Sequence, residues 1–144
     1  MRPLFAGWGW RAAAQRQSFA SCWAQACARP LQGAWRFALL ESRRETAAWA
    51  EFAAWQHAAV PEAMCHAWPE SAIASIDTPS QSSRLVARFA TGSVCEALAL
   101  HAARQQGAQA QLLLHRIVSA DRQATLAIAG LALPQEYSET GVHP

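Results

Sequence analysis

The sequence predicts an all-α protein whose elongated antiparallel helices form a coiled coil or bundle. Alanine is its most frequent residue and 52% of its residues are apolar, a composition that favours helices because alanine has the highest helix propensity. Glycine and β-branched residues are few, and no segment shows convincing strand alternation. We expect two long helices, with a short proline-bounded helix and a linker between them. The 144 residues are expected to form a single domain.

The N-terminal segment predicts an irregular arm followed by a helix. Residues 1–10 contain a proline and two glycines, which interrupt regular structure. Residues 11–29 are rich in alanine, glutamine and arginine, which are good helix formers. Phe19, Cys22 and Trp23 in this segment fall on one helical face. The first helix is therefore expected to bury that face.

The strongest helix candidate covers residues 31–59, which contain no proline. Trp49, Phe52 and Trp55 follow one another at intervals of three residues and form a stripe of rings. In the first turns, by contrast, the apolar side chains do not share one face. This pattern is typical of a helix that is central in an assembly or lies against another surface.

The C-terminal half predicts a second long helix. A short helix over residues 61–68 is expected to begin at Pro61, since proline suits the first turn of a helix. Residues 82–133 then carry an apolar helical stripe, which Asp121 interrupts. Residues 134–144 are expected to form a polar tail.

No catalytic or metal-binding motif stands out. Glu62, Cys65 and His66 are close together, but the paired Glu-x-x-His pattern of a di-metal helix bundle is missing. Adjacent side chains such as Cys65 and His66 point about 100° apart on a helix. Cys95 and His101 have no supporting catalytic signature. We therefore expect no metal, no cofactor and no enzymatic activity.

Charge and cysteine usage exclude further classes. The chain has 12 basic residues, none of them lysine, and 10 acidic residues, for a net charge of +2. Arg43 and Arg44 form the only basic doublet, so no nucleic-acid partner is expected. The four cysteines form no CxxC pair, which is typical of thiols in a reducing cytoplasm. No apolar run approaches the roughly 20 residues of a transmembrane helix, so the sequence predicts a cytoplasmic protein.

The aromatic rings carry the strongest functional signal. All seven tryptophans lie at or before Trp68, and alanine offers little apolar area with which to enclose them. Two interpretations remain open, an ordinary aromatic core or a face of rings that contacts an apolar surface outside the chain. The residues expected at such a surface or at a partner are Trp23, Trp35, Phe37, Trp49, Phe52 and Trp55.

The order of the expected helices resembles a known family. An Ala/Gln-rich helix with Phe19 and Trp23 precedes the long segment LQGAWRFALLESRRETAAWAEFAAWQ, the break AAVPEAM and a second Ala/Gln-rich helix ending at Pro134. In this layout the chain resembles the phasins, small helical proteins that coat polyhydroxyalkanoate storage granules. The resemblance implies a cytoplasmic, non-enzymatic granule coat, with rings on the polyester and polar residues in water.

Two further expectations accompany this resemblance. Away from a granule, the same faces are expected to pair between chains, giving a homo-oligomer through helix faces. The alternative function is a small helical interaction or adaptor module with an ordinary aromatic core and a groove for a partner helix. A helical enzyme with a metal or thiol site ranks behind both.

Overall fold

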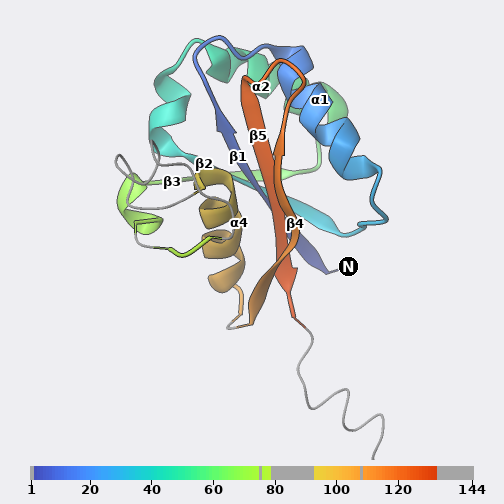
Figure 1. The fold of residues 1–144 in the computed structure, drawn as a ribbon, viewed down its shortest axis with the longest axis vertical. Coiled ribbons are helices and arrows are strands. Elements are labelled where there is room, and N and C mark those ends of the chain that lie inside the picture. The colour runs from blue at the N-terminus through green and yellow to red at the C-terminus, as the bar shows by residue number, and fades with distance from the viewer. Residues whose placement is uncertain (1, 75, 79–92, 108, 133–144) are drawn as a thin grey trace, which may run out of the picture.

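The computed structural model describes residues 2–74, 76–78, 93–107 and 109–132, and it shows an α/β fold instead of the predicted all-α one. A mixed five-stranded sheet in the order β3-β2-β1-β5-β4 carries helices on both faces (Figure 1). The strands are β1 (Pro3–Trp10), β2 (Ala34–Leu40), β3 (Met64–Trp68), β4 (Ala110–Val118) and β5 (Ala124–Leu131). The helices are α1 (Arg16–Cys27), α2 (Ala48–Ala59) and α4 (Val94–Arg104), with short 3-10 helices η1 (Glu41–Glu45) and η2 (Glu70–Ala72).

The sheet has a parallel part and an antiparallel part that meet at β1. Strand β2 is parallel to both β1 and β3, so both connections must cross over the sheet. Helix α1 connects β1 to β2 and helix α2 connects β2 to β3, both on one face. On its other side β1 pairs antiparallel with β5, which forms a hairpin with β4. Helix α4 packs on the opposite face from α1 and α2. The direction of the sheet therefore changes beside its central strand.

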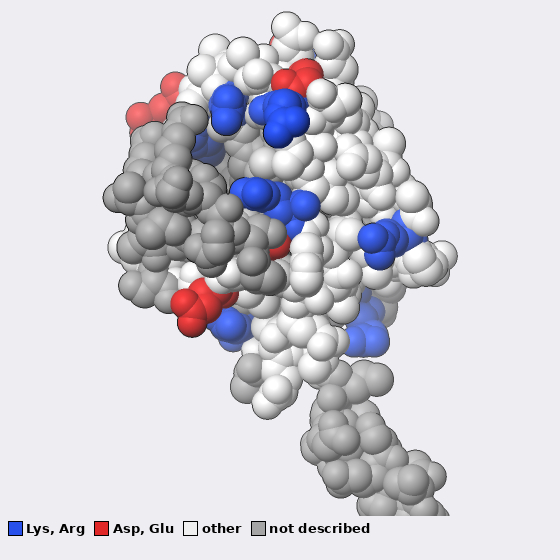
Figure 2. Space-filling view, viewed as in Figure 1, with Lys and Arg blue, Asp and Glu red and all other residues white. Residues whose placement is uncertain are grey.

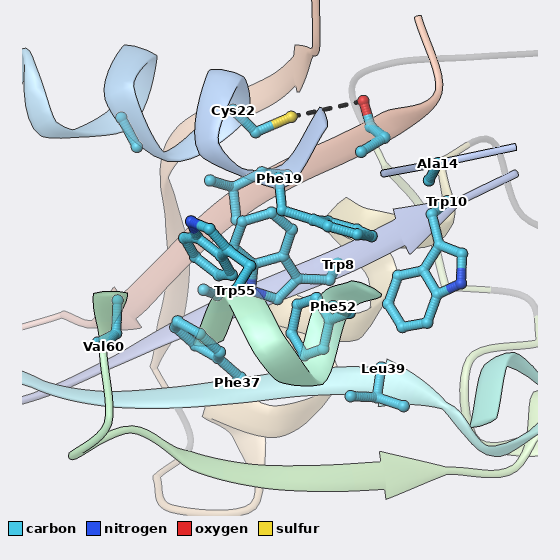
Figure 3. Close-up of a cluster of buried hydrophobic side chains, with 14 of the residues drawn as sticks. Trp8, Trp10, Ala14, Phe19, Cys22, Phe37, Leu39, Phe52, Trp55 and Val60 are labelled. Atoms are coloured by element: carbon cyan, nitrogen blue, oxygen red, sulfur yellow. Dashed lines mark hydrogen bonds between the residues drawn. The ribbon is translucent and has the colours of Figure 1, made fainter. Parts of the chain in front are cut away.

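One face of the sheet is filled with aromatic rings. Because side chains alternate along a strand, β1 directs Trp8 and Trp10 toward α1 and α2. Trp8 is completely buried, and its ring centroid lies 5.1 Å from that of Trp55 and 5.4 Å from that of Phe52 (Figure 3). Phe19 of α1 contacts both Trp8 and Trp10 edge-on. These interlocking rings enclose one another inside a single chain.

The other face of the sheet combines small residues with Phe5 and with leucine and isoleucine side chains. Gly7 of β1 lies directly under α4, and a Cβ atom there would collide with the Cys95 carbonyl oxygen and approach the Ala99 nitrogen to 2.7 Å. Ala97, Ala99 and Ala103 of α4 are completely buried. The helix backbone therefore lies very close to the sheet, which a side chain at position 7 would prevent.

Three parts of the predicted all-α layout are wrong, and strand periodicity explains why. The expected arm, residues 1–10, contains β1, the central strand. The expected long helix over residues 31–59 divides into β2, η1 and α2, and the expected helix over residues 61–68 contains β3. In β2 the large apolar residues follow at every second position rather than on one helical face, as expected for a strand. The structure does place α1 within the predicted 11–29 segment.

The predicted helix over residues 82–133 is also wrong where the structure describes it. Its first part, residues 82–92, and the expected tail, residues 134–144, lie outside the described residues. The remainder contains α4, β4 and β5. Asp121, which interrupts the predicted stripe, lies in the turn between β4 and β5, where it accepts hydrogen bonds from the Ser119 and Ser18 hydroxyls, each at 2.6 Å. Within the described ranges, no helix is long and apolar enough to cross a membrane.

Candidate functional site

The candidate site lies at the carboxyl ends of β1, β2 and β3, where α4 begins. Because β4 runs parallel to β1 and follows α4, the helix starts at this end of the sheet. In open α/β sheets, ligands bind outside the carboxyl ends of the strands, where the strand order reverses. Here that reversal falls beside β1. The topology therefore favours a ligand site formed by the loops after β1 and β2 and by the first turn of α4.

The first turn of α4 holds a buried carboxylate. Ser93 precedes the helix and its hydroxyl accepts a hydrogen bond from the Glu96 backbone N–H at 3.4 Å. Glu96 is completely buried, and its Oε2 accepts a hydrogen bond from the Arg116 backbone N–H at 2.8 Å. The carboxylate thus joins the start of α4 to the edge strand β4.

A β-bulge makes this connection possible. Between Leu114 and Ile117, β4 has one more residue than the facing stretch of β5 from Ile128 to Leu126. A bulge disrupts the ladder locally and redirects the side chains near it. In this bulge the N–H of Arg116 is directed to Glu96. Glu96 and the bulge together fix the backbone position of Arg116, whose side chain is half-buried.

Arginine side chains supply positive charge at this end of the sheet. Arg43 of η1 donates from Nη1 to the carbonyl oxygen of Trp10, at the end of β1, over 3.0 Å. Thr46 reinforces the connection, since its hydroxyl accepts from Trp10 Nε1 at 3.1 Å. Arg11 directly follows β1. Figure 2, drawn from the same side as Figure 1, shows several basic side chains on the upper part of this face.

The cysteine next to the buried carboxylate is not a prepared nucleophile. Burial raises the pKa of Cys95 to about 11, although hydrogen bonds with Ser93 and Thr125 and the charge of Arg116 lower it in part. The thiolate is the reactive form, so Cys95 stays protonated and unreactive near neutral pH. The pairing of Cys95 with His101 considered from the sequence is not built as a dyad, because His101 packs edge-on against Trp68, at 4.4 Å between ring centroids.

The other candidate residues from the sequence are separated by the fold. Cys65 and His66 are neighbours on β3, so their side chains point to opposite faces of the sheet. Glu62 precedes that strand in a turn. In the part of the chain that the structure describes, no group of three or more His, Cys, Asp or Glu side chains is arranged to hold a metal ion.

The six ring residues predicted for an apolar surface share one cluster, between the sheet and helices α1 and α2. Phe37, Phe52 and Trp55 are buried in that cluster, at 1%, 0% and 7% exposure. The other three are partly buried and pack against it; they are Trp23, Trp35 and Trp49. All six therefore lie together on the face opposite the buried Glu96, and this packing does not by itself test the predicted contact of the partly exposed rings with a surface or partner outside the chain.

Sequence reasoning missed Ser93, Glu96 and Arg116. One signal was available, because Ser93-Val94-Cys95-Glu96 has the Ser-x-x-Glu spacing that marks the start of a helix. The pattern would have placed a helix start at Ser93 instead of inside a long helix. Arg116 carried no such signal, since its position depends on a bulge in strand pairing.

Comparisons with known proteins agree with this fold. Residues 4–129 match the family model described as "Cobalamin synthesis G C-terminus". The crystal structure of CobE, a protein from the cobalamin (vitamin B12) biosynthetic pathway, is similar with a TM-score of 0.71 at 19% identity, over 91% of this chain and 92% of that one. Cobalamin biosynthesis protein chiG from Agrobacterium tumefaciens str. C58 is similar with a TM-score of 0.59 at 22% identity, over 90% and 99%. No curated protein sequence matches the chain.

Proposed function

We propose, from the premise that this chain belongs to the cobalamin synthesis G C-terminus family, that it binds a corrin-type intermediate of cobalamin biosynthesis. The binding site in this proposal is the carboxyl end of the parallel strands, beside the first turn of α4. The observation that carries the proposal is the family match itself, which spans residues 4–129 and so includes β1, the start of α4 and the bulge in β4.

The phasin resemblance is wrong, because the family match is to cobalamin synthesis and the fold is α/β rather than all-α. The predictions of a granule coat, of a polyester partner and of a homo-oligomer through helix faces depended on that resemblance and are wrong as well. The alternative of a small helical adaptor module is not supported either, since it also requires an all-α fold. The location on a granule surface has no support.

The chemistry of the site suits an anionic ligand. A corrin is a conjugated macrocycle, and its biosynthetic precursors carry side chains that end in carboxylates. Arginine pairs well with carboxylates because its planar guanidinium donates two parallel hydrogen bonds. Arg43 and Arg116 lie at the two sides of the α4 start, one after β2 and one in β4. The N-terminal end of α4 adds a favourable field for negative charge.

We further propose that the role is binding without catalysis. The thiol beside the site is protonated at neutral pH, and Glu96 is engaged with the backbone of β4. Neither group is free to act as a nucleophile. As expected from the sequence, we also propose that the protein uses no cofactor of its own.

A titration tests the proposal directly. The probe is dicyanocobyrinic acid, a corrin with free carboxylates, and the readout is quenching of tryptophan fluorescence. Arg43→Gln and Arg116→Gln are each expected to weaken binding about tenfold, since hydrogen bonds to charged groups are worth about 1.5–3 kcal/mol. Arg29→Gln is the matched control, because Arg29 is exposed and follows α1 at the opposite end of the sheet.

Dicyanocobinamide, whose side chains are amidated, is the ligand control and is expected to bind more weakly than the carboxylate form. Circular dichroism of each variant checks that the fold is retained. Failure of dicyanocobyrinic acid to bind, or equal losses in all three arginine variants, would contradict the proposal.

A further inference from the structure

A cluster of two imidazoles and one indole lies on the α4 face of the sheet, apart from the aromatic core. The cluster consists of His66, Trp68 and His101, and we call it the imidazole–indole cluster. The rings of His66 and Trp68 stack with centroids 4.0 Å apart and planes 25° apart. The His101 ring meets Trp68 at 4.4 Å and 86°, edge against face.

The fold brings these three residues together from separate elements. His66 and Trp68 are two positions apart on β3, so they share one face of the strand. They pair in register with Ala38 and Leu40 of β2. Ala38 and Leu40 belong to the hydrophobic cluster under α4, which shows that this is the α4 face.

The cluster differs from the aromatic core in its exposure. The aromatic core is covered by α1 and α2, whereas β3 is an edge strand and His66 is exposed. Trp68 is half-buried behind His66, so it supports the imidazole from one side and holds its plane in place. An exposed ring with a fixed orientation offers a stacking surface that does not have to be ordered when a ligand binds.

Two polar atoms in the cluster are buried without a hydrogen-bond partner. Trp68 Nε1 and His101 Nε2 are buried and have no hydrogen-bond partner among the described residues. In the ring cluster under α1 and α2, the Trp10 indole N–H has a partner, the Thr46 hydroxyl, whereas Trp8 Nε1 has none. A buried polar atom without a partner costs free energy, so a ligand atom that paired with Trp68 Nε1 or His101 Nε2 would recover that cost.

Two arginines lie near the cluster. Arg36 of β2 pairs in register with Met64, one step along the same face from His66. Arg104 follows His101 on α4, and burial, Arg104 and His66 together lower the pKa of His101. His101 is therefore neutral near pH 7, and the two arginines are the permanent cations here. The surface is suited to a flat ligand with anionic side groups.

We infer that the imidazole–indole cluster stacks against the conjugated ring of the corrin-type ligand, with His66 as the exposed contact and Trp68 as its support. The inference rests on the proposed function and adds to it the surface that receives the ring. In this arrangement Arg36 and Arg104 bind the carboxylates of the ligand, and the imidazole–indole cluster binds its flat macrocycle.

Substitutions at His66 test the inference in the dicyanocobyrinic acid titration. His66→Ala removes the exposed ring and is expected to weaken binding roughly three- to tenfold, the range that corresponds to the extra stabilisation of an aromatic pair. His66→Phe keeps a flat ring without its nitrogens and is expected to retain near-wild-type affinity. His57→Ala is the matched control, since His57 is also exposed but lies in α2 on the other face.

Each outcome is decisive. Weaker binding by His66→Ala, with His66→Phe and His57→Ala unchanged, supports stacking. Equal losses in His66→Ala and His66→Phe would show that a nitrogen rather than the ring makes the contact, and would overturn the inference. Unchanged affinity in His66→Ala would overturn it as well, while leaving the proposed function in place. Failure of the unmodified chain to bind would end both.

Discussion

The two faces of the sheet differ in how many aromatic rings they contain. The face under α1 and α2 holds large rings that contact one another, with Trp8, Phe19 and Phe52 completely buried. The face under α4 holds small residues around Gly7 together with Phe5 and aliphatic side chains, and it also contains the buried polar side chains of Ser93 and Glu96. Both faces belong to the same five strands.

We infer from this difference that the face with the rings mainly stabilises the fold and that the start of α4 mainly binds the ligand. Rings that interlock on one face give the sheet a large buried apolar area. That area allows the other face to hold a buried carboxylate, which is costly unless it is hydrogen-bonded. The close approach of α4 at Gly7 then brings the start of the helix to the carboxyl ends of the strands. We expect substitutions on the ring face to change stability and those at the start of α4 to change binding.

The largest effect is expected from Phe52→Ala, on the ring face. The substitution removes a completely buried ring that contacts Trp8, Trp10 and Phe19, and should lower the free energy of unfolding by about 3–5 kcal/mol. Urea denaturation measures the change. Phe52→Leu, which keeps much of the volume, should cost distinctly less. If both variants bound corrin less well while unfolding at the same urea concentration as the unmodified chain, the division between faces would be wrong.

Gly7→Ala is expected to have the next largest effect, on the α4 face. Its Cβ atom would collide with the Cys95 carbonyl oxygen, which belongs to the helix backbone and cannot rotate away. The loss in unfolding free energy should be near the upper end of about 1–3 kcal/mol. Gly9→Ala is the control, because its Cβ would meet only the Thr125 hydroxyl, at 2.8 Å, and that side chain can turn. Equal stability of the two variants would argue against the close approach of α4.

Glu96→Ala should have a moderate effect on stability and a clear effect on binding. The substitution leaves the Arg116 N–H without its carboxylate partner, at a cost of about 1–2 kcal/mol because Arg116 is only half-buried. The bulge in β4 is then no longer fixed, so affinity for dicyanocobyrinic acid should also fall. Glu96→Gln keeps an acceptor oxygen and should restore most of both. If Glu96→Gln behaved like Glu96→Ala, the charge itself rather than the acceptor would be needed.

The smallest effect is expected at Asp121, in the turn between β4 and β5. Hydrogen bonds from Ser119 and Ser18 lower the pKa of Asp121 below its ordinary value. A carboxylate with a lowered folded-state pKa stabilises the fold above the unfolded-state pKa, and this contribution is lost as the pH falls through the folded-state value. Asp121→Asn should therefore lose less than about 1 kcal/mol at neutral pH, since the group is exposed.

The pH dependence provides the check. Thermal unfolding of the unmodified chain should lose this contribution only below about pH 4, near the ordinary pKa of aspartate. Asp121→Asn should show a smaller dependence in that range. Identical profiles for the two proteins would show that the Asp121 hydrogen bonds do not contribute to stability.

The sequence predicted helices well where the buried face repeats with helical spacing. Phe19, Cys22 and Ala26 are buried on α1, and Phe52 and Trp55 on α2, all within segments expected to be helical. The strands were missed for a physical reason. Alanine supports a helix in isolation, and a central strand such as β5 is apolar on both faces, so it shows no alternation.

The candidate site was missed as well as the fold class, although one part of it carried a signal. Glu96 could have been found from the helix-start pattern at Ser93, but that pattern does not predict that its carboxylate accepts a hydrogen bond from the Arg116 backbone N–H. The role of Arg116 depends on a bulge, which arises only when β4 pairs with β5. The contact between His66 and His101 through Trp68 likewise requires the complete sheet with α4 packed on it.

Amide hydrogen exchange with and without dicyanocobyrinic acid tests the central claim most directly, because it reports on both faces in one measurement. The claim is that a corrin binds beside the start of α4 and leaves the ring face untouched. We predict slower exchange in the first turn of α4, in η1, in β3 around His66 and at the Arg116 bulge of β4, with α1 and α2 unchanged. Protection confined to α1 and α2, or no protection anywhere, would contradict it.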